Sequence, residues 1–310
     1  MGVPFKLVFY AADPQLANRA AAAAFARVVE LNRFMSDYDA DSELSRLCRT
    51  AATGTAVKVA AVKVSGPLWE VLCESQQLAC ETGGAFDVTA GPYVRLWRRA
   101  RRQRHLPSEE LMTEARAAVG YRHLELDARA RTVHLTRPKM RLDLGGIAIG
   151  YTVDEMLRLL ARQGITRALV DASGDIGAGD PPPGKRGWTV AVSTSEADPD
   201  AVCYVEIARG AITTSGDALQ HVDIGGRRFS HVVDPRTGMA LTDRGSVTVY
   251  ARRCVDADRW ATALSVLDPK QGIALIERKP GAAARIVRTT DRGLQTVRSS
   301  RWDALGCQNR

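Results

Sequence analysis

The sequence predicts an α+β fold built as a single large domain over residues 1–310. Helical and extended patterns both occur, but they do not alternate in the regular strand–helix–strand order of parallel sheets. Long helical patterns dominate the first half, and short strand patterns follow one another from residue 167 onward. A length of 310 residues with a hydrophobic fraction of 45% is sufficient for a sizeable core.

The first half is expected to hold long helices bounded by short strands. Residues 4–10 are rich in β-forming side chains and predict a strand. Asp13 and Pro14 then mark the start of a helix reaching Met35, because Asp caps a helix and Pro suits its first turn. The remaining elements expected here are a helix from about Pro67 to Cys80 that ends at Gly83 and Gly84, a strand at 131–137, and a helix from about Gly150 to Gln163 closed by Gly164.

The second half is expected to form a sheet of short strands with one long helix. Strand patterns occur at 167–172, 188–192, 203–208, 227–233 and 246–251, and two more are expected within 283–298. A long helix is predicted at about 255–267 and a shorter one at 268–279. Residues 179–187, "GDPPPGKRG", predict a surface turn rather than a linker between domains.

The chain is mildly basic, with a formal charge of +8. Part of the excess lies in "RRARRQRH" (98–105), for which we expect a solvated loop rather than a nucleic-acid surface, since no aromatic side chains are interleaved with it. No nucleic-acid partner is therefore expected. A general positive field also suits an anionic substrate.

The six cysteines are scattered and include no C-x-x-C pair. That spacing indicates neither a zinc site nor a disulfide framework, so reduced and mostly buried cysteines are expected. The N-terminus, "MGVPFKLVFYAADP", shows no signal-peptide pattern or lipobox, and no apolar run is long enough to span a membrane. As given, the chain is expected to be soluble, and its localisation stays open.

Three glycine-rich stretches lie between predicted elements. Residues 81–92, "ETGGAFDVTAGP", place three glycines around Asp87, which is typical of a helix stop and also of a binding loop. Residues 143–150, "DLGGIAIG", precede a helix whose N-terminal amides favour an anion. Residues 171–179, "DASGDIGAG", place Asp171 and Asp175 at a strand end, where functional loops and ordinary turns both occur.

Three further stretches carry polar side chains. "TTSGD" (213–217) offers hydroxyls beside a glycine, and "RFSHVVDPRTG" (228–238) contains His231. In a strand His231 faces away from Val232, so burial does not explain it simply. In "DADRWATAL" (256–264), Asp258 and Thr262 are four apart and share one helix face. This pair predicts either an exposed capping turn or oxygen ligands for Mg²⁺, with a carbonyl of the glycine loop as a third ligand.

In this order the motifs resemble the ApbE family, the FAD:protein FMN transferases. The stretches that carry the resemblance are "MGVPFKLVFYAAD", "FMSDYDADSELSRL", "TGGAFDVTAGPYVRLW", "DLGGIAIGYTVD", "LVDASGDI", "TTSGD", "RFSHVVDPRTG" and "DADRWATALSVL". Only about 285–310 falls outside the resemblance, as a C-terminal extension. The resemblance implies an ApbE-like (T-fold-like) fold, with mixed sheets flanked by helices around an FAD cleft.

The resemblance also implies an activity. Family members bind FAD and Mg²⁺ and transfer FMN to a threonine hydroxyl of an acceptor protein, releasing AMP. The acceptor is expected to be a redox subunit, and many family members are exported or membrane-anchored. Two alternatives stay open: an FAD pyrophosphatase that gives FMN and AMP, and a protein that binds FAD without turnover.

Residues carried over from the family motifs form three sets. His231 and Asp258 are expected to be catalytic, with His231 as the acceptor of the threonine proton. The metal set consists of Gly146 through its carbonyl, Asp258 and Thr262. The cofactor set consists of Met1, Tyr38, Ala85, Phe86, Asp87, Asp143, Ile149 and Val232.

The chain departs from the family pattern at two motifs. The family usually reads "DLGGIAKG", with a lysine on the cofactor, whereas this chain has Ile149. The loss of that cation is expected to weaken binding by roughly 1.5–3 kcal/mol, the worth of a charged hydrogen bond. The family's "NAGGD" is "DASGD" here, so Asp171 adds a negative charge. Activity is expected to survive with altered cofactor affinity.

Overall fold

The computed structural model describes residues 2–51, 61–193, 202–216, 221–243, 245–290 and 293–307. Met1, one of the predicted cofactor residues, lies outside this range. Contacts group the chain into two compact units, each built from separated segments. Unit 1 comprises Met1–Glu30, Ile147–Ala218 and Asp243–Arg310, and unit 2 comprises Leu31–Gly146 and Leu219–Thr242. The prediction of one domain over the whole chain stays a prediction.

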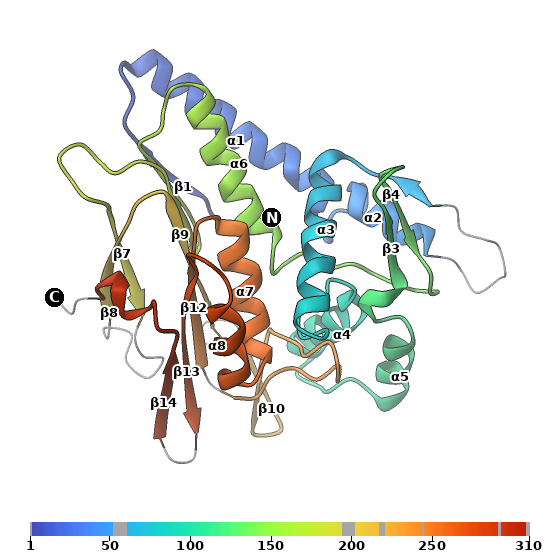
Figure 1. The fold of residues 1–310 in the computed structure, drawn as a ribbon. Helices are drawn as coiled ribbons and strands as arrows, with labels where there is room; N and C mark the ends of the chain where they lie inside the picture. The colour runs from blue at the N-terminus through green and yellow to red at the C-terminus, as the bar shows by residue number, and fades with distance from the viewer. Residues whose placement is uncertain are drawn as a thin grey trace. The chain divides into compact units, whose positions relative to one another are not determined.

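Unit 1 is built on an antiparallel sheet (Figure 1). Among the described residues it has seven strands in the order β1-β5-β6-β9-β12-β13-β14. Each neighbouring pair is antiparallel. The strands are β1 (Lys6–Phe9), β5 (Ala168–Ala172), β6 (Asp175–Ala178), β9 (Gly210–Gly216), β12 (Gly245–Ala251), β13 (Ala283–Thr290) and β14 (Gly293–Arg298).

Two layers cover the central strands of this sheet. The helices α6 (Ala148–Arg162) and α7 (Cys254–Val266) pack on strands β5, β6, β9 and β12 (Figure 1). The strands β7 (Trp188–Ser193) and β8 (Val202–Ile207) form a core cluster with Ile212 of β9. The next residue, Thr213, lies against Cys254 of α7. Because successive strand residues point to opposite faces, β7 and β8 cover the face opposite α6 and α7.

The C-terminal segment is part of unit 1. Helix α8 (Pro269–Glu277) begins at Asp268, whose carboxylate accepts backbone N–H groups of the first turn. After β14, Trp302 is 2% exposed in the cluster around β7 and β8. Cys307 forms a disulfide with Cys203 of β8, across a sequence separation of 104. The expectation of reduced cysteines is therefore wrong for this pair, which the fold brings together from distant positions.

The free cysteines also differ from expectation. Of the four, Cys254 is buried, Cys48 and Cys73 are half-buried, and Cys80 is exposed. They are therefore not mostly buried.

Unit 2 consists of helices with two small sheets. The helices other than the end of α1 (Pro14–Met35) are α2 (Glu43–Thr50), α3 (Gly66–Glu81), α4 (Gly91–Gln103) and α5 (Glu109–Ala117). One sheet has the order β2-β4-β3, with β2 (Val62–Lys63), β3 (Leu124–Asp127) and β4 (Thr132–Leu135). The other is a hairpin of β10 (His221–Ile224) and β11 (Arg227–Ser230).

The core of unit 2 anchors the β10–β11 hairpin on α4 and α5. Tyr93, Trp97 and Ala100 follow the helical spacing of an apolar stripe and are buried with Phe229. The rings of Trp97 and Phe229 lie 5.0 Å apart, and the Trp97 indole N–H donates to the Gly238 carbonyl at 2.8 Å. The basic run at 98–105, expected as a loop, is in fact helical as far as Gln103. Ala100, the apolar residue within this run, is buried in this core.

The α+β class is confirmed, and most predicted elements are present within a few residues of their expected bounds. One difference bears on function: the strand expected at 227–233 ends at Ser230, so His231 follows it in a bend. Across the described residues, no helix combines the length and apolar character needed to cross a membrane.

Candidate functional site

The predicted pair Asp258 and Thr262 lies on α7 in unit 1. Asp258 is 5% exposed, and its carboxylate accepts the Gly150 backbone N–H of α6 at 2.9 Å. The two helices are in close contact here, because a Cβ on Gly150 would lie 2.5 Å from the Cys254 carbonyl oxygen. Glycine at 150 therefore allows the contact that holds Asp258. Thr262 follows Asp258 by one helical turn and is half-buried.

Two carboxyl groups, the buried Asp175 and the half-buried Asp154, lie near enough to Asp258 to affect it. Burial, Asp175 and Asp154 together raise the pKa of Asp258 well above its ordinary value. Burial also raises the pKa of Asp175 to about 7. Within the described part of the chain no cationic side chain is paired with Asp258. Buried carboxyl groups without a cationic partner offer oxygen donors that suit a hard divalent cation, which would favour their ionised forms on binding.

Among the described residues, no three His, Cys, Asp or Glu side chains lie around one possible metal position. The predicted metal set contains only one such side chain, because Gly146 contributes a carbonyl and Thr262 a hydroxyl. The predicted set therefore stays a prediction. In the sequence Asp175 is only a strand-end residue, and the tertiary fold brings it close to Asp258.

The "DASGD" stretch forms a tight hairpin between β5 and β6. Ser173 and Gly174 both have positive φ, 58° and 100°, as a two-residue hairpin turn with φ > 0 at both positions requires. The Asp171 carboxylate accepts the Gly174 backbone N–H at 3.1 Å. Asp171 therefore contributes to the turn itself, which is a structural role for the residue that departs from the family pattern.

In unit 2, two of the predicted cofactor segments lie side by side. The Asp143 backbone N–H donates to the Val88 carbonyl at 2.8 Å, and Ala90 pairs with Arg141. The structure thus brings "AFD" (85–87) next to "DLGG" (143–146). Ala85, Phe86 and Asp87 are 1%, 4% and 9% exposed.

Asp87 is fixed within its own loop. Its carboxylate accepts the backbone N–H and the hydroxyl of Thr89 at 2.8 and 2.7 Å. Burial raises the pKa of Asp87, and these hydrogen bonds oppose the rise.

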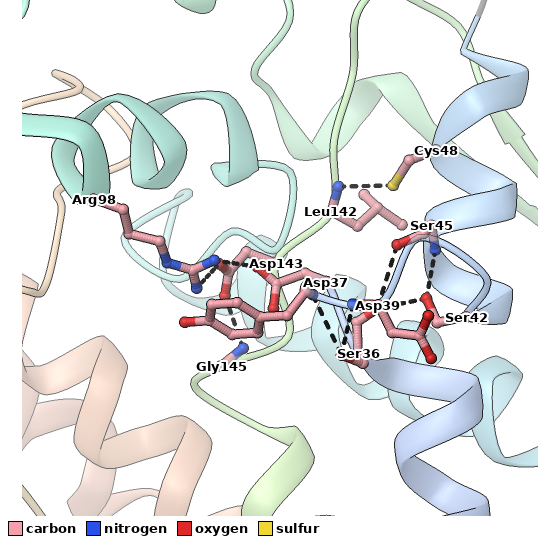
Figure 2. A network of polar contacts seen from close by, with 11 residues as sticks. Ser36, Asp37, Asp39, Ser42, Ser45, Cys48, Arg98, Leu142, Asp143 and Gly145 are labelled. Atoms are coloured by element: carbon pink, nitrogen blue, oxygen red, sulfur yellow. Dashed lines mark hydrogen bonds and ion pairs between the residues drawn. The ribbon is translucent and has the colours of Figure 1, made fainter. Parts of the chain in front are cut away.

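Tyr38 and Asp143 both contact Arg98 of α4 in unit 2. The Arg98 guanidinium lies 4.4 Å from the centre of the Tyr38 ring. It donates to Asp143 at 2.8 Å (Figure 2). Tyr38 is 74% exposed, so most of its ring surface is open. Sequence reasoning missed Arg98 because it treated the basic run as a solvated loop.

Asp143 also holds the glycine loop ahead of α6. Its second carboxylate oxygen accepts the Gly145 backbone N–H at 2.8 Å. That amide, expected among the groups that bind phosphate, therefore has an internal partner. Gly146 follows and is half-buried. Ile149, the departure from the family lysine, lies in the first turn of α6 in unit 1 and is half-buried.

The backbone around His231 is held on both sides in unit 2. The Ser230 N–H donates to the Leu241 carbonyl at 2.7 Å, and the Leu241 N–H donates to the Val232 carbonyl at 2.9 Å. The Ser230 hydroxyl also accepts the Val232 N–H at 3.1 Å. His231 is half-buried and precedes a turn closed by the Gly238 N–H on the Asp234 carbonyl.

Known proteins match this chain over nearly its whole length. The model of the ApbE family matches residues 1–286. An FAD:protein FMN transferase of Vibrio cholerae is 34% identical over 266 residues, which cover 84% of this chain and 77% of the relative. An FAD:protein FMN transferase of Escherichia coli is 30% identical over 272 residues, covering 84% and 74%.

Solved structures also resemble this chain over nearly its whole length. The flavin transferase ApbE from Vibrio cholerae superposes with a TM-score of 0.87 at 30% identity, covering 98% of this chain and 96% of that chain. The apo flavinyl transferase ApbE of Pseudomonas stutzeri gives 0.84 at 28% identity, covering 99% and 94%. These proteins are transferases by name, as the sequence predicts for this chain. With the family match and relatives of this identity and coverage, the chain belongs to the ApbE family.

Proposed function

We propose that this protein transfers the FMN half of FAD to a threonine hydroxyl of an acceptor protein and releases AMP. The observation that carries the proposal most directly is Asp258, a buried carboxylate held by the Gly150 N–H with no cationic partner among the described residues. The names of the relatives support flavin transfer, and the acceptor is expected to be a redox subunit.

The chemistry asks for alignment and charge neutralisation rather than covalent catalysis. The threonine oxygen forms a bond to the phosphorus of the FMN half, and the bond from that phosphorus to the AMP oxygen breaks. Asp258 and Thr262 of α7 are the residues proposed to hold Mg²⁺, and their carboxylate and hydroxyl oxygens suit it. When bound, Mg²⁺ supplies positive charge at the pyrophosphate.

His231 is proposed to accept the threonine proton. A histidine imidazole is the side chain that most often serves as a general base. The hydrogen bonds on both sides of His231 support the proposal, because a general base needs a fixed position.

The test is to incubate the protein with FAD, Mg²⁺ and a redox subunit that carries a candidate acceptor threonine, and to measure AMP and protein-bound flavin together. Transfer gives both products in equal amounts. AMP with free FMN indicates the pyrophosphatase alternative, and bound FAD without AMP indicates a binding protein. His231→Ala is expected to abolish transfer while FAD still binds, and undiminished transfer by that variant would exclude His231 as the base.

A further inference from the structure

Arg98 lies in a basic run but is not a solvated residue. Its side chain is 28% exposed and contacts the carboxylates of Asp37 and Asp143 (Figure 2), and it also contacts the Tyr38 ring. Arg99, the next residue, is exposed, and its hydrogen-bond partner among the described residues is Gln103 of the same helix, at 3.0 Å. The two neighbouring arginines therefore differ in what they contact, although their sequence context is the same.

Arg98 joins three separate segments of unit 2. Nη1 forms an ion pair with Asp37, which follows α1, and Nη2 donates to Asp143 Oδ2 at 2.8 Å. The plane of the guanidinium approaches the Tyr38 ring, with Cζ 4.4 Å from the ring centre. One side chain on α4 thus fixes both Tyr38 and Asp143, each by a contact suited to a planar cation.

The charges in this cluster determine what Arg98 can do. Two carboxylates share one guanidinium, so Arg98 is already neutralised and does not replace the lysine that the family has at position 149. Burial and the neighbouring Asp37 raise the pKa of Asp143, and Arg98 opposes that rise. Arg98 therefore favours the ionised form of Asp143, whose other oxygen then accepts the Gly145 N–H at 2.8 Å.

We propose that Arg98 is a positioning residue for flavin binding, acting through the Tyr38 ring and the Asp143 carboxylate. The inference rests on the proposed function, because Tyr38 and Asp143 are flavin contacts only if the chain binds FAD. Arg98 holds the open face of Tyr38 in one orientation and fixes the glycine loop before α6 through Asp143. FAD then binds to a preorganised surface, so ordering that surface costs less of the binding free energy.

The experiment measures the dissociation constant of FAD by titrating its fluorescence with the full chain. Arg98→Met removes the charge at similar length, and we expect it to weaken FAD binding roughly 10- to 100-fold, the worth of lost charged hydrogen bonds. Arg98→Lys keeps the charge but lacks the bidentate geometry of the guanidinium. We expect it to retain part of the FAD affinity that Arg98→Met loses. Arg99→Met, the matched control, is expected to bind as the wild type.

A double-mutant cycle separates positioning from a general loss of structure. If Arg98 acts through Asp143, Arg98→Met costs much less in an Asp143→Ala background than in the wild type, because the interaction is already absent. Full additivity of the two losses would overturn the proposal. Should Arg98→Met fail to fold, Arg98→Lys, which lacks the bidentate geometry, takes its place, and FAD binding by that folded variant equal to the wild type would also overturn the proposal.

The outcomes distinguish this inference from the proposed function. If the wild type does not bind FAD, the proposed function fails and this inference fails with it. If the wild type binds FAD and Arg98→Met binds equally well, only the role of Arg98 is refuted.

Discussion

Ile149 is the residue at which the resemblance implies the clearest departure from the family pattern. It lies in the first turn of α6, where a lysine is expected, and is half-buried there. Its neighbour Gly150 donates to Asp258 at 2.9 Å, so the start of α6 is tied to the carboxylate that we propose binds Mg²⁺. An apolar side chain at this position contributes no charge to a pyrophosphate.

We predict that Ile149→Lys tightens FAD binding. A charged hydrogen bond is worth about 1.5–3 kcal/mol, whereas a cation near a helix N-terminus costs about 0.3–1 kcal/mol. The gain exceeds the cost, so the dissociation constant is expected to fall about tenfold. Ile149→Met is the uncharged control. Equal affinity of both variants for FAD in calorimetry would place residue 149 away from the cofactor.

At the scale of elements, the contact between α6 and α7 depends on Gly150. Alanine normally stabilises a helix more than glycine does, by about 0.8–1 kcal/mol per residue. Here its Cβ would lie 2.5 Å from a backbone oxygen and 2.8 Å from the Asp258 Cβ. The backbone atoms cannot shift without a large energetic cost. The overpacking therefore destabilises the fold by about 1–3 kcal/mol, which exceeds the gain in helix propensity.

Gly150→Ala is therefore expected to lower the free energy of unfolding and to weaken Mg²⁺ binding by displacing Asp258. Urea unfolding and calorimetric Mg²⁺ titration measure the two effects. Gly66→Ala, at the start of α3, is the control, because no atom lies within 4 Å of the added Cβ. A Gly150→Ala variant as stable as the control would refute the close helix contact.

Asp154 on α6 caps the start of α7. Its carboxylate accepts the backbone N–H groups of Cys254 and Val255 at 2.8 and 3.0 Å. Burial raises the pKa of Asp154 to about 6, although these bonds oppose the rise. The folded chain thus binds this proton more tightly than the unfolded chain, whose carboxyl has an ordinary pKa near 3.9.

The contribution of Asp154 to stability is therefore expected to fall as pH rises from about 4 to 6. The change is on the order of 3 kcal/mol at 1.36 kcal/mol per unit. Asp154→Asn cannot ionise. The free energy of unfolding of the wild type should therefore fall relative to that of the variant as pH rises over this range. A difference independent of pH in urea titrations would contradict the raised pKa.

Elements with strong local signals could be predicted from the sequence. Asp13 and Pro14 define the start of α1, and the spacing of apolar residues defines α6 and α7. Helix α4 was missed because its apolar stripe, Tyr93, Trp97 and Ala100, is interrupted by arginines that resemble a solvated loop. A basic run can be the polar face of an amphipathic helix, and its buried member cannot be identified without the fold.

The candidate site shows the same limit. Family motifs supplied Asp258 and Asp143, but their partners Asp175 and Arg98 come from distant segments that only the tertiary structure brings close. The end of β11 at Ser230, just before His231, likewise depends on the Leu241 contacts and not on local propensity.

At the scale of the whole molecule, the Cys203–Cys307 disulfide ties the C-terminal segment to β8. It closes a loop across a separation of 104 residues, so it restricts the unfolded chain strongly. We predict that reduction, or Cys307→Ser, lowers the free energy of unfolding by about 2–4 kcal/mol.

Thermal unfolding with and without a thiol reductant measures this effect. The wild type is expected to lose stability on reduction, whereas Cys307→Ser should be insensitive to the reductant. Cys80→Ser, which removes an exposed free thiol, is the control and should behave as the wild type. An identical melting temperature for the oxidised and reduced wild type would show that the disulfide does not stabilise unit 1.

The family assignment shows a flavin transferase, and we propose that Asp258 is its metal-binding carboxylate. The most direct test is the intact mass of the acceptor subunit after incubation with FAD, Mg²⁺ and this protein. The account predicts a mass increase equal to FMN less one water, located on a threonine, that requires Mg²⁺ and is lost with Asp258→Asn. An unmodified acceptor with the wild type, or full modification with Asp258→Asn, would contradict it.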